Sequence, residues 1–214
     1  MIEEYRQVEE ERRMTRSQRV LLFGRSIAAF AMIVFAAYAT MIPIDSLNST
    51  FKSTAHAQIQ TAAKVGALAP DIAFTAVDGS EYQLSDFRGR PVMLWFYASW
   101  CPTCQVGTMA VAGVVDQLKL AGVQIIQLQL YNNLGYPGPT AEEFARQYAS
   151  SVPRSPNWLW GDASLVASYT YDPQGYPDIY FLIDENGTLR AMDFAPHVTM
   201  DKILEFAQAA NRSG

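Results

Sequence analysis

Cysteine and histidine are scarce in this chain, which has two residues of each type among 214. A disulfide scaffold needs several spaced cysteines, and a structural zinc site needs about four ligands. Cys101 and Cys104 lie three positions apart, whereas His56 and His197 are far from them in sequence. The scarcity therefore argues against a disulfide scaffold and against a bound metal, and it favours a redox-active cysteine pair.

An excess of positive charge is also absent, because 16 Lys and Arg stand against 21 Asp and Glu, for a net charge of -5. Binding to a phosphate backbone needs a basic surface, so nucleic acid is not an expected partner. Low-complexity sequence is absent from residue 66 onward, and half of the residues are apolar. This composition is typical of one packed domain of ordinary size with additional segments.

Charge is missing from residues 26–44, a run of 19 residues. Its length is close to the roughly 20 residues that a helix needs to cross a bilayer, and lipid leaves the backbone no alternative to a helix. Only Lys52 and Lys64 follow it closely, whereas five arginines precede it: Arg12, Arg13, Arg16, Arg19 and Arg25. The positive-inside rule then places the N-terminus in the cytoplasm and the rest of the chain outside.

The expected organisation is a charged cytoplasmic tail at 1–19, a single-pass membrane anchor at 20–44, a linker at 45–65 and an extracytoplasmic domain at 66–214. A cleaved signal peptide is the competing interpretation, since Ala55-His56-Ala57 has the form of a cleavage site. The apolar run is longer than a typical signal sequence and ends well before that site, which favours the anchor. Both interpretations export the rest of the chain.

Strand-like and helix-like patterns alternate along residues 66–214, and they open with two extended segments around the hairpin signal Asp78-Gly79. Thr140 and Glu143 form a capping-box pattern at the start of one helix, and Thr199 is expected to cap the last. Strands are predicted at 73–77, 81–84, 91–97, 123–130, 178–183 and 188–194, and helices at 102–120, from 140, at 163–171 and at 200–210. This order predicts one layered α/β domain.

Cys101-Pro102-Thr103-Cys104 begins the helix that follows the apolar strand ending near Tyr97. The free N–H groups and the dipole at a helix N-terminus favour a thiolate, which is the attacking species in thiol chemistry. Pro102 suits the first helical position, where a backbone donor is not needed. Three residues bring Cys104 back to the same side of the helix, so Cys101 is predicted to attack a disulfide and Cys104 to resolve the mixed disulfide.

Residues 85–104, which end in Trp-Cys-Pro-Thr-Cys, resemble the active-site segment of membrane-anchored thioredoxin-like proteins of the TlpA/ResA type. Residues 175–184 are similar to a second segment of that family, Gly-x-Pro-x-x-Phe-Leu-Ile-Asp. The resemblance covers about residues 66–212. It implies a thioredoxin fold, here with an N-terminal β-hairpin extension and one preceding transmembrane helix.

The resemblance also implies roles for individual residues. Pro177 would follow a cis peptide bond in a loop that faces the cysteines, and the backbone of Tyr176 would pair with a bound substrate chain. From its position next to Cys101, Trp100 is expected to shield that thiol and shape the contact with a partner, with a cover over the rim of the core as the alternative. The catalytic candidates are thus Cys101 and Cys104, and the supporting or substrate-contacting candidates are Trp100, Pro102, Thr103, Tyr176 and Pro177.

The partners that the resemblance implies are exported proteins with thiols or disulfides, cytochrome precursors among them, and a membrane donor or acceptor of electrons. No cofactor is expected. The direction of the reaction (reduction, oxidation or isomerisation) stays open, as does the identity of each partner.

Two positions depart from the family pattern. Thioredoxins carry a buried aspartate six residues before the first cysteine, where this chain has Trp95. Some relatives instead carry a glutamate three residues after the second cysteine, where this chain has Gly107. Proton transfer at Cys104 must therefore use water or a group distant in sequence.

Three other functions remain open. A thiol peroxidase would use Cys101 as its nucleophile, but Ala98 stands where that family needs a threonine. A Sco-type copper carrier would bind Cu(I) through the two thiolates, with His197 as the candidate third ligand. A non-catalytic adaptor would use the fold only to hold a partner. Residues 131–139, rich in turn formers, are expected to be a plain strand–helix connection, with substrate contact as the alternative.

Overall fold

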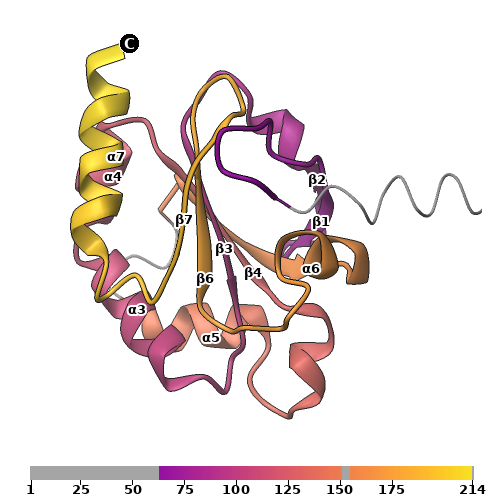
Figure 1. Cartoon of the computed structure of the whole chain (residues 1–214). Helices are drawn as coiled ribbons and strands as arrows, with labels where there is room; N and C mark the ends of the chain where they lie inside the picture. Colours follow the sequence, from indigo (N-terminus) through magenta and orange to yellow (C-terminus); the bar gives the residue numbers. More distant parts are fainter. Residues whose placement is uncertain (1–62, 151–154, 214) are drawn as a thin grey trace, which may run out of the picture. The chain divides into compact units, whose positions relative to one another are not determined.

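A seven-stranded sheet with helices on both faces forms the centre of the computed structural model (Figure 1), which describes residues 63–150 and 155–213. These residues belong to one compact unit, Ala57–Gly214. Within the described ranges, no helix is both long enough and apolar enough to cross a membrane. The predicted tail, anchor, cleavage site and most of the predicted linker lie outside the described residues.

The strands follow the order β2-β1-β5-β4-β3-β6-β7 across the sheet. The central strands β3, β4 and β5 are parallel, while the flanking pairs β1–β2 and β6–β7 are antiparallel hairpins. Their bounds are β1 Ala73–Ala76, β2 Glu81–Gln83, β3 Val92–Tyr97, β4 Gln124–Gln129, β5 Trp158–Ala163, β6 Ile179–Ile183 and β7 Leu189–Phe194. This is the mixed α/β thioredoxin-like architecture, and the predicted N-terminal hairpin is present as β1 and β2.

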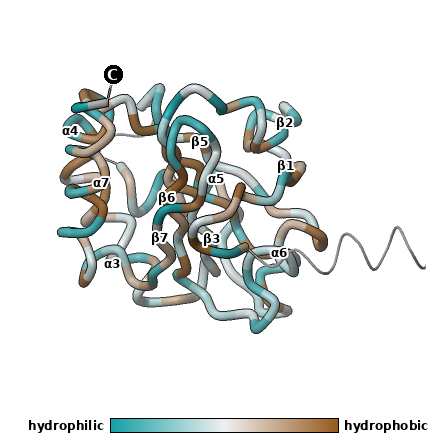
Figure 2. Tube along the Cα trace, turned by 45° about the horizontal axis from the view of Figure 1, so that its top comes forward, coloured by the Kyte–Doolittle hydropathy of each residue, from teal (hydrophilic) through white to brown (hydrophobic). Residues whose placement is uncertain are grey.

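Every residue of β3 and β6 is buried, which agrees with the continuous apolar runs in their sequences. Alternate side chains point to opposite faces. Trp95 and Tyr97 enter the core beneath one helical layer, and Leu94 and Phe96 enter the core on the other face. Figure 2 shows the hydrophobic colouring concentrated along these central strands.

Helices cover the two faces unequally. The helices α3 (Pro102–Ala112), α4 (Val115–Leu120), α5 (Ala141–Tyr148) and α7 (Met200–Ser213) contribute to the core that contains Trp95. The helix α6 (Leu165–Tyr171) and the short 3-10 helix η1 (Leu84–Phe87) contribute to the core on the other face. In Figure 1, α3, α4 and α7 lie to the left of the sheet and α6 to the right. The cysteine-bearing helix therefore lies on the more thickly covered face.

The structure differs from the sequence-based expectations in three elements. The predicted helix 102–120 is two helices, because the chain leaves helical geometry at Val114, after the cap residue Gly113. Strand β5 was not predicted, and its parallel pairing with β4 and antiparallel pairing with β1 join the hairpin to the rest of the sheet. Thr199 precedes α7, but its hydroxyl donates back to the Phe194 carbonyl, 3.1 Å away.

Candidate active site

The cysteine pair lies where β3 passes into α3. Cys101 is the N-cap residue of α3 and Pro102 the first helical residue, as the sequence predicts. The Cys101 N–H donates to the Ala98 carbonyl at 3.0 Å, and the Cys101 carbonyl accepts from the Gln105 N–H at 3.2 Å. These bonds fix the first cysteine at the positive end of the helix, and one turn later Cys104 enters the core.

The two thiols have very different surroundings. Both are free, and the exposed fraction is 4% for Cys101 and 0% for Cys104. The pKa of Cys101 is lowered to about 5, chiefly by the Cys104 thiol and then, against the effect of burial, by the Thr103 hydroxyl and nearby N–H groups. Burial above all raises the pKa of Cys104. At neutral pH, Cys101 is therefore the thiolate and Cys104 keeps its proton.

Thr103 contacts the reactive sulfur directly, because its Oγ1 lies 3.1 Å from Cys101 Sγ. Its side chain and that of Pro102 are exposed beside the thiol. A hydroxyl in this position can donate to a thiolate and thereby stabilise the charge. The predicted supporting residues Pro102 and Thr103 thus lie at the reacting atom.

The two residues that depart from the family pattern, Trp95 and Gly107, pack against each other. The side chain of Trp95 is fully buried, and its ring lies against Gly107, where an added Cβ would come within 3.1 Å of Trp95 Cζ2. A side chain at position 107 would therefore require this tightly packed indole to shift. The Trp95 Nε1–H donates to Oδ1 of Asp178 at 3.1 Å. The tryptophan thus brings a carboxylate from a distant segment toward the cysteine pair.

Asp178 is a buried carboxylate next to the active site that the sequence interpretation missed. It is 2% exposed, and its Oδ2 has no hydrogen-bond partner. The pKa of Asp178 is raised to about 7, chiefly by burial and also by the charge of Cys101, while hydrogen bonds from the Thr103 hydroxyl and the Trp95 indole act in the opposite direction. Asp178 in turn raises the pKa of Cys104. Thiols and carboxyl therefore form one electrostatically coupled group.

Asn133 holds the loop that precedes the cysteines. Its Oδ1 accepts from the Ser99 N–H at 2.9 Å, and its Nδ2 donates to Ser99 Oγ at 3.0 Å and to the Tyr136 carbonyl at 2.9 Å. The Asn133 carbonyl accepts from Trp100 Nε1 at 2.9 Å, and the ring of Trp100 packs 5.0 Å from that of Tyr136. Asn133 lies in the 3-10 segment η2 (Tyr131–Gly135). The loop predicted as a plain connection therefore positions Trp100.

The expected cis bond before Pro177 is wrong, since no cis peptide bond occurs among residues 63–150 and 155–213. The chain turns here at Gly175 and Asp178, which both have positive φ values (70° and 72°). The Tyr176 N–H already donates to Asp172 Oδ1 at 2.9 Å. A substrate chain could use this N–H only by displacing Asp172, although the Tyr176 side chain itself is exposed.

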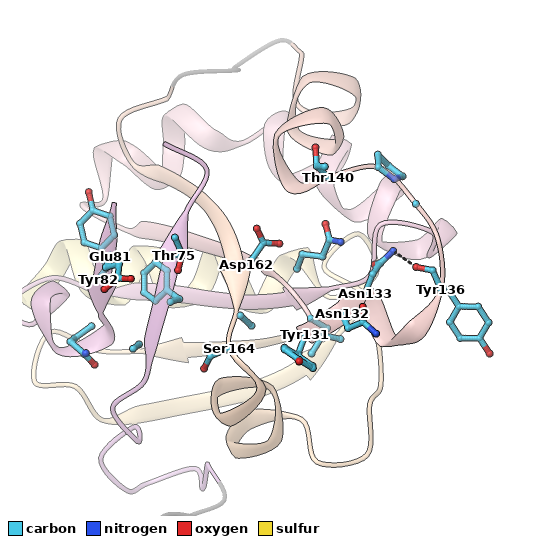
Figure 3. A pocket seen from close by; sticks show the side chains of 18 of the residues that line it. Thr75, Glu81, Tyr82, Tyr131, Asn132, Asn133, Tyr136, Thr140, Asp162 and Ser164 are labelled. Carbon is cyan, nitrogen blue, oxygen red and sulfur yellow. Dashed lines mark hydrogen bonds between the residues drawn. The ribbon is translucent and has the colours of Figure 1, made fainter. Parts of the chain in front are cut away.

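An open pocket of about 920 Å³ adjoins the loop that Asn133 holds (Figure 3). Asn133 and Tyr136 belong to its wall, and the dashed line in Figure 3 marks their hydrogen bond. Neither cysteine lines it. The other labelled residues come from the N-terminal hairpin, the segment after β4 and the end of β5: Thr75, Glu81, Tyr82, Tyr131, Asn132, Thr140, Asp162 and Ser164. The pocket is thus a neighbour of the thiol site and separate from it.

His197, the candidate copper ligand, is half-buried in the connection before α7, and its Nδ1 has no hydrogen-bond partner. In the described part of the chain, no three His, Cys, Asp or Glu side chains are grouped closely enough to hold a metal ion. The structure therefore does not bring His197 together with the two cysteines as a metal site.

Similarity to known proteins agrees with this geometry. Residues 64–204 match the family model described as Redoxin. The chain belongs to the Redoxin family. Its relatives include thiol-disulfide oxidoreductase ResA of Geobacillus kaustophilus, 31% identical over 131 residues, which are 61% of this chain and 70% of ResA. Peroxiredoxin Bcp of Escherichia coli is 27% identical over 159 residues, 67% of this chain and 94% of Bcp.

Among solved structures, a Chlorobium tepidum protein assigned as thiol:disulfide interchange protein DsbE has a TM-score of 0.52 and 25% identity, over 70% of this chain and 99% of that protein. Together these relatives identify this Redoxin-family chain as a TlpA/ResA-type thioredoxin-like protein and a thiol–disulfide oxidoreductase.

Proposed function

We propose that this protein exchanges thiols and disulfides with exported proteins outside the cytoplasm, with Cys101 as the attacking thiolate and Cys104 as the resolving thiol. The observation that carries the proposal is the contrast between the two thiols. The pKa of Cys101 is lowered to about 5 at the start of α3, and that of Cys104 is raised by burial. Attack and resolution are thereby assigned to different sulfur atoms.

In the proposed reaction, the Cys101 thiolate attacks one sulfur of a substrate disulfide, and the other substrate sulfur leaves as a thiolate. Cys104 then loses its proton and attacks Cys101 Sγ. The disulfide Cys101–Cys104 forms, the second substrate thiolate leaves, and the substrate is reduced by two electrons. The reverse sequence would oxidise a substrate dithiol.

A trapping experiment tests these roles. The Cys104→Ser full chain should form a stable mixed disulfide with a peptide disulfide, detected by mass spectrometry, because nothing resolves it. The Cys101→Ser variant is the matched control and should form little adduct, since the remaining sulfur is fully buried. Equal adducts on both variants would contradict the proposed assignment.

The direction of the reaction depends on the potential of the Cys101/Cys104 couple. Equilibration of the full chain with glutathione or dithiothreitol buffers measures it. A value near about -270 mV resembles thioredoxin and supports an exported reductase that receives electrons from a membrane donor, with cytochrome precursors as one substrate class. A value of about -120 to -180 mV supports an oxidase or isomerase with a membrane acceptor.

Similarity to peroxiredoxin Bcp supports a second candidate, a thiol peroxidase with Cys101 as the peroxidatic residue. The site favours it less, because Ala98 offers no hydroxyl and no cationic side chain of the described residues lowers the pKa of Cys101. Consumption of hydrogen peroxide by the reduced full chain decides between the two. Turnover at a rate above that of disulfide exchange would favour the peroxidase.

A further inference from the structure

The active site leaves one chemical requirement open. Cys104 must lose its proton before it attacks Cys101, yet its thiol is fully buried and its pKa is raised by that burial. Trp95 and Gly107, which pack against each other beside the cysteine pair, offer no carboxylate. A proton acceptor must therefore come from another segment or from water.

Asp178 directly precedes β6, which pairs with β3 in the register Trp95–Tyr180. Trp95 and Tyr180 belong to the core on the face that α3 covers, together with Cys104, and the hydrogen bond to Trp95 places the Asp178 carboxylate on that same face. The Trp95 Nε1–H holds Oδ1 of the carboxylate at 3.1 Å. The other oxygen, Oδ2, is buried and accepts no well-formed hydrogen bond, although the Thr103 hydroxyl is near enough to lower the pKa of the carboxyl. An unpartnered carboxylate oxygen in a core destabilises the fold, and a catalytic role is one explanation for its presence.

We propose that Asp178, held by the Trp95 indole, exchanges the proton of Cys104 during resolution of the mixed disulfide. This inference rests on the proposed function. When a substrate is reduced, Asp178 takes the Cys104 proton, the Cys104 thiolate attacks Cys101 Sγ, and the departing substrate thiolate takes up that proton. When a substrate is oxidised, Asp178 returns the proton to the Cys104 thiolate as it leaves the disulfide.

The electrostatics suit this exchange. The pKa of Asp178 is raised to about 7, so the carboxyl can hold or release a proton near neutral pH. The groups that affect it are Cys101 and the Thr103 hydroxyl from α3 and the Trp95 indole from β3; no cationic side chain of the described residues is among them. Once Cys101 is in a mixed disulfide its negative charge is gone, and the pKa of Asp178 falls below that of the reduced enzyme.

Reaction of the reduced full chain with dithionitrobenzoate separates the two steps. Attack by Cys101 releases one thionitrobenzoate, and resolution by Cys104 releases the second, so stopped-flow absorbance gives a rate for each phase. General acid–base groups contribute roughly 10²–10⁴-fold to a rate. Asp178→Asn keeps the shape and an acceptor for Trp95, and at pH 8 it should slow the second phase by about 100-fold with little effect on the first.

The pH profile distinguishes proton exchange from a merely structural role. In the wild type, the second phase should accelerate as Asp178 ionises, and Asp178→Asn should remove that step. Trp95→Phe removes the donor that stabilises the charged carboxylate, so it should move the step to higher pH. This second variant keeps the test informative if Asp178→Asn folds poorly in a thermal melt.

Asp162→Asn is the matched control, because burial also raises the pKa of Asp162 but Asp162 affects the pKa of neither cysteine. It should leave both phases unchanged. A second phase slowed less than tenfold by Asp178→Asn at pH 8, with the pH step retained, would overturn the role of Asp178. If the wild-type protein releases no thionitrobenzoate in the first phase, Cys101 does not attack the disulfide, and the proposed function itself is overturned.

Discussion

Two sulfur atoms one helical turn apart carry the chemistry of this protein, and their neighbours make them unequal. Cys101 has a thiol, a hydroxyl and backbone N–H groups around it, all of which lower its pKa. Cys104 is surrounded by core side chains and faces the negative charges of Cys101 and Asp178, which raise its pKa. A thiolate next to a protonated thiol is the arrangement that orders attack before resolution.

Thr103 should tune the nucleophile. Thr103→Val removes the hydroxyl that lies 3.1 Å from Cys101 Sγ, so the pKa of Cys101 should rise from about 5. The rate of alkylation by iodoacetamide, followed against pH, reports this value, because Cys104 is buried and protonated. The midpoint should move to higher pH in Thr103→Val and stay near the wild-type value in Thr103→Ser. Equal shifts in both variants would refute a role for the hydroxyl.

Ionisation of the buried Asp178 carboxyl should destabilise the folded protein at high pH. The pKa of this carboxyl in the folded protein, about 7, lies above the ordinary 3.8, so the folded state holds a proton that the unfolded state has lost. Stability therefore falls as the pH rises from about 4 to about 7, and above 7 the cost of the buried charge is complete. Asp178→Asn should raise the melting temperature relative to the wild type at pH 8 more than at pH 4, by at least about 2 °C.

Thermal melts of the two reduced proteins at both pH values check this prediction. If the difference in melting temperature between variant and wild type is the same at pH 4 and pH 8, the carboxyl does not titrate between them. The expected gain in stability together with the expected loss of resolution rate would mark Asp178 as a residue kept for function.

At the scale of elements, the active-site loop depends on η2, a short segment with an unusual backbone. Asn132, Asn133 and Leu134 all have positive φ values, between 49° and 58°. Asparagine tolerates this conformation better than most residues. The strain is offset by the bonds of Asn133 to Ser99 and Tyr136, which join η2 to the segment between β3 and α3.

Asn133→Ala should therefore destabilise the protein by about 1–3 kcal/mol, because it leaves the buried N–H of Ser99 unpaired and removes the bonds to Ser99 Oγ and to the Tyr136 carbonyl. It should also weaken substrate binding, because the Asn133 side chain no longer holds in place the main-chain carbonyl that accepts from Trp100. Asn132→Ala is a matched control, since Asn132 has nearly the same φ but an exposed side chain. Denaturant unfolding and KM for a peptide disulfide measure the two effects. Equal losses in both variants would assign the cost to backbone strain instead.

The packing of α3 on β3 brings together Trp95 and Gly107, the two positions that lack the carboxylate of the family pattern. Trp95 fills the space over Gly107, and the same indole reaches Asp178. Where the family pattern has a carboxylate on the strand or on the helix, this chain thus has a tryptophan on the strand and a glycine on the helix. The sequence alone showed the two absences, and the packing shows that they belong together.

For the whole molecule, the decisive question is the side of the membrane on which the thiol domain lies. The charge pattern predicts a cytoplasmic N-terminus, an anchor at 20–44 and an exported domain. Reporter cysteines in a chain with Cys101→Ser and Cys104→Ser can test this arrangement. Ser80→Cys, at an exposed turn, should react with a membrane-impermeant maleimide in bacterial spheroplasts, and Ser17→Cys should react only after lysis.

Sedimentation with membranes after a carbonate wash would further distinguish an anchor from a signal peptide cleaved after Ala57. An anchored chain stays in the pellet, and a cleaved one is released at a lower mass. Labelling of Ser17→Cys in intact spheroplasts would overturn the predicted orientation.

The amino-acid sequence by itself determined the α/β class, most strands, the capping box of α5 and the position of Cys101 at the start of a helix. Each of these depends on neighbours within a few residues, and local spacing encodes it. Only the tertiary structure decided that Asp178 lies beside Trp95, 83 positions away, and that Asn133 holds Ser99, 34 positions away. It also decided the trans bond before Pro177 and the place of β5. Contacts between distant segments depend on sheet register and packing, which local patterns do not encode.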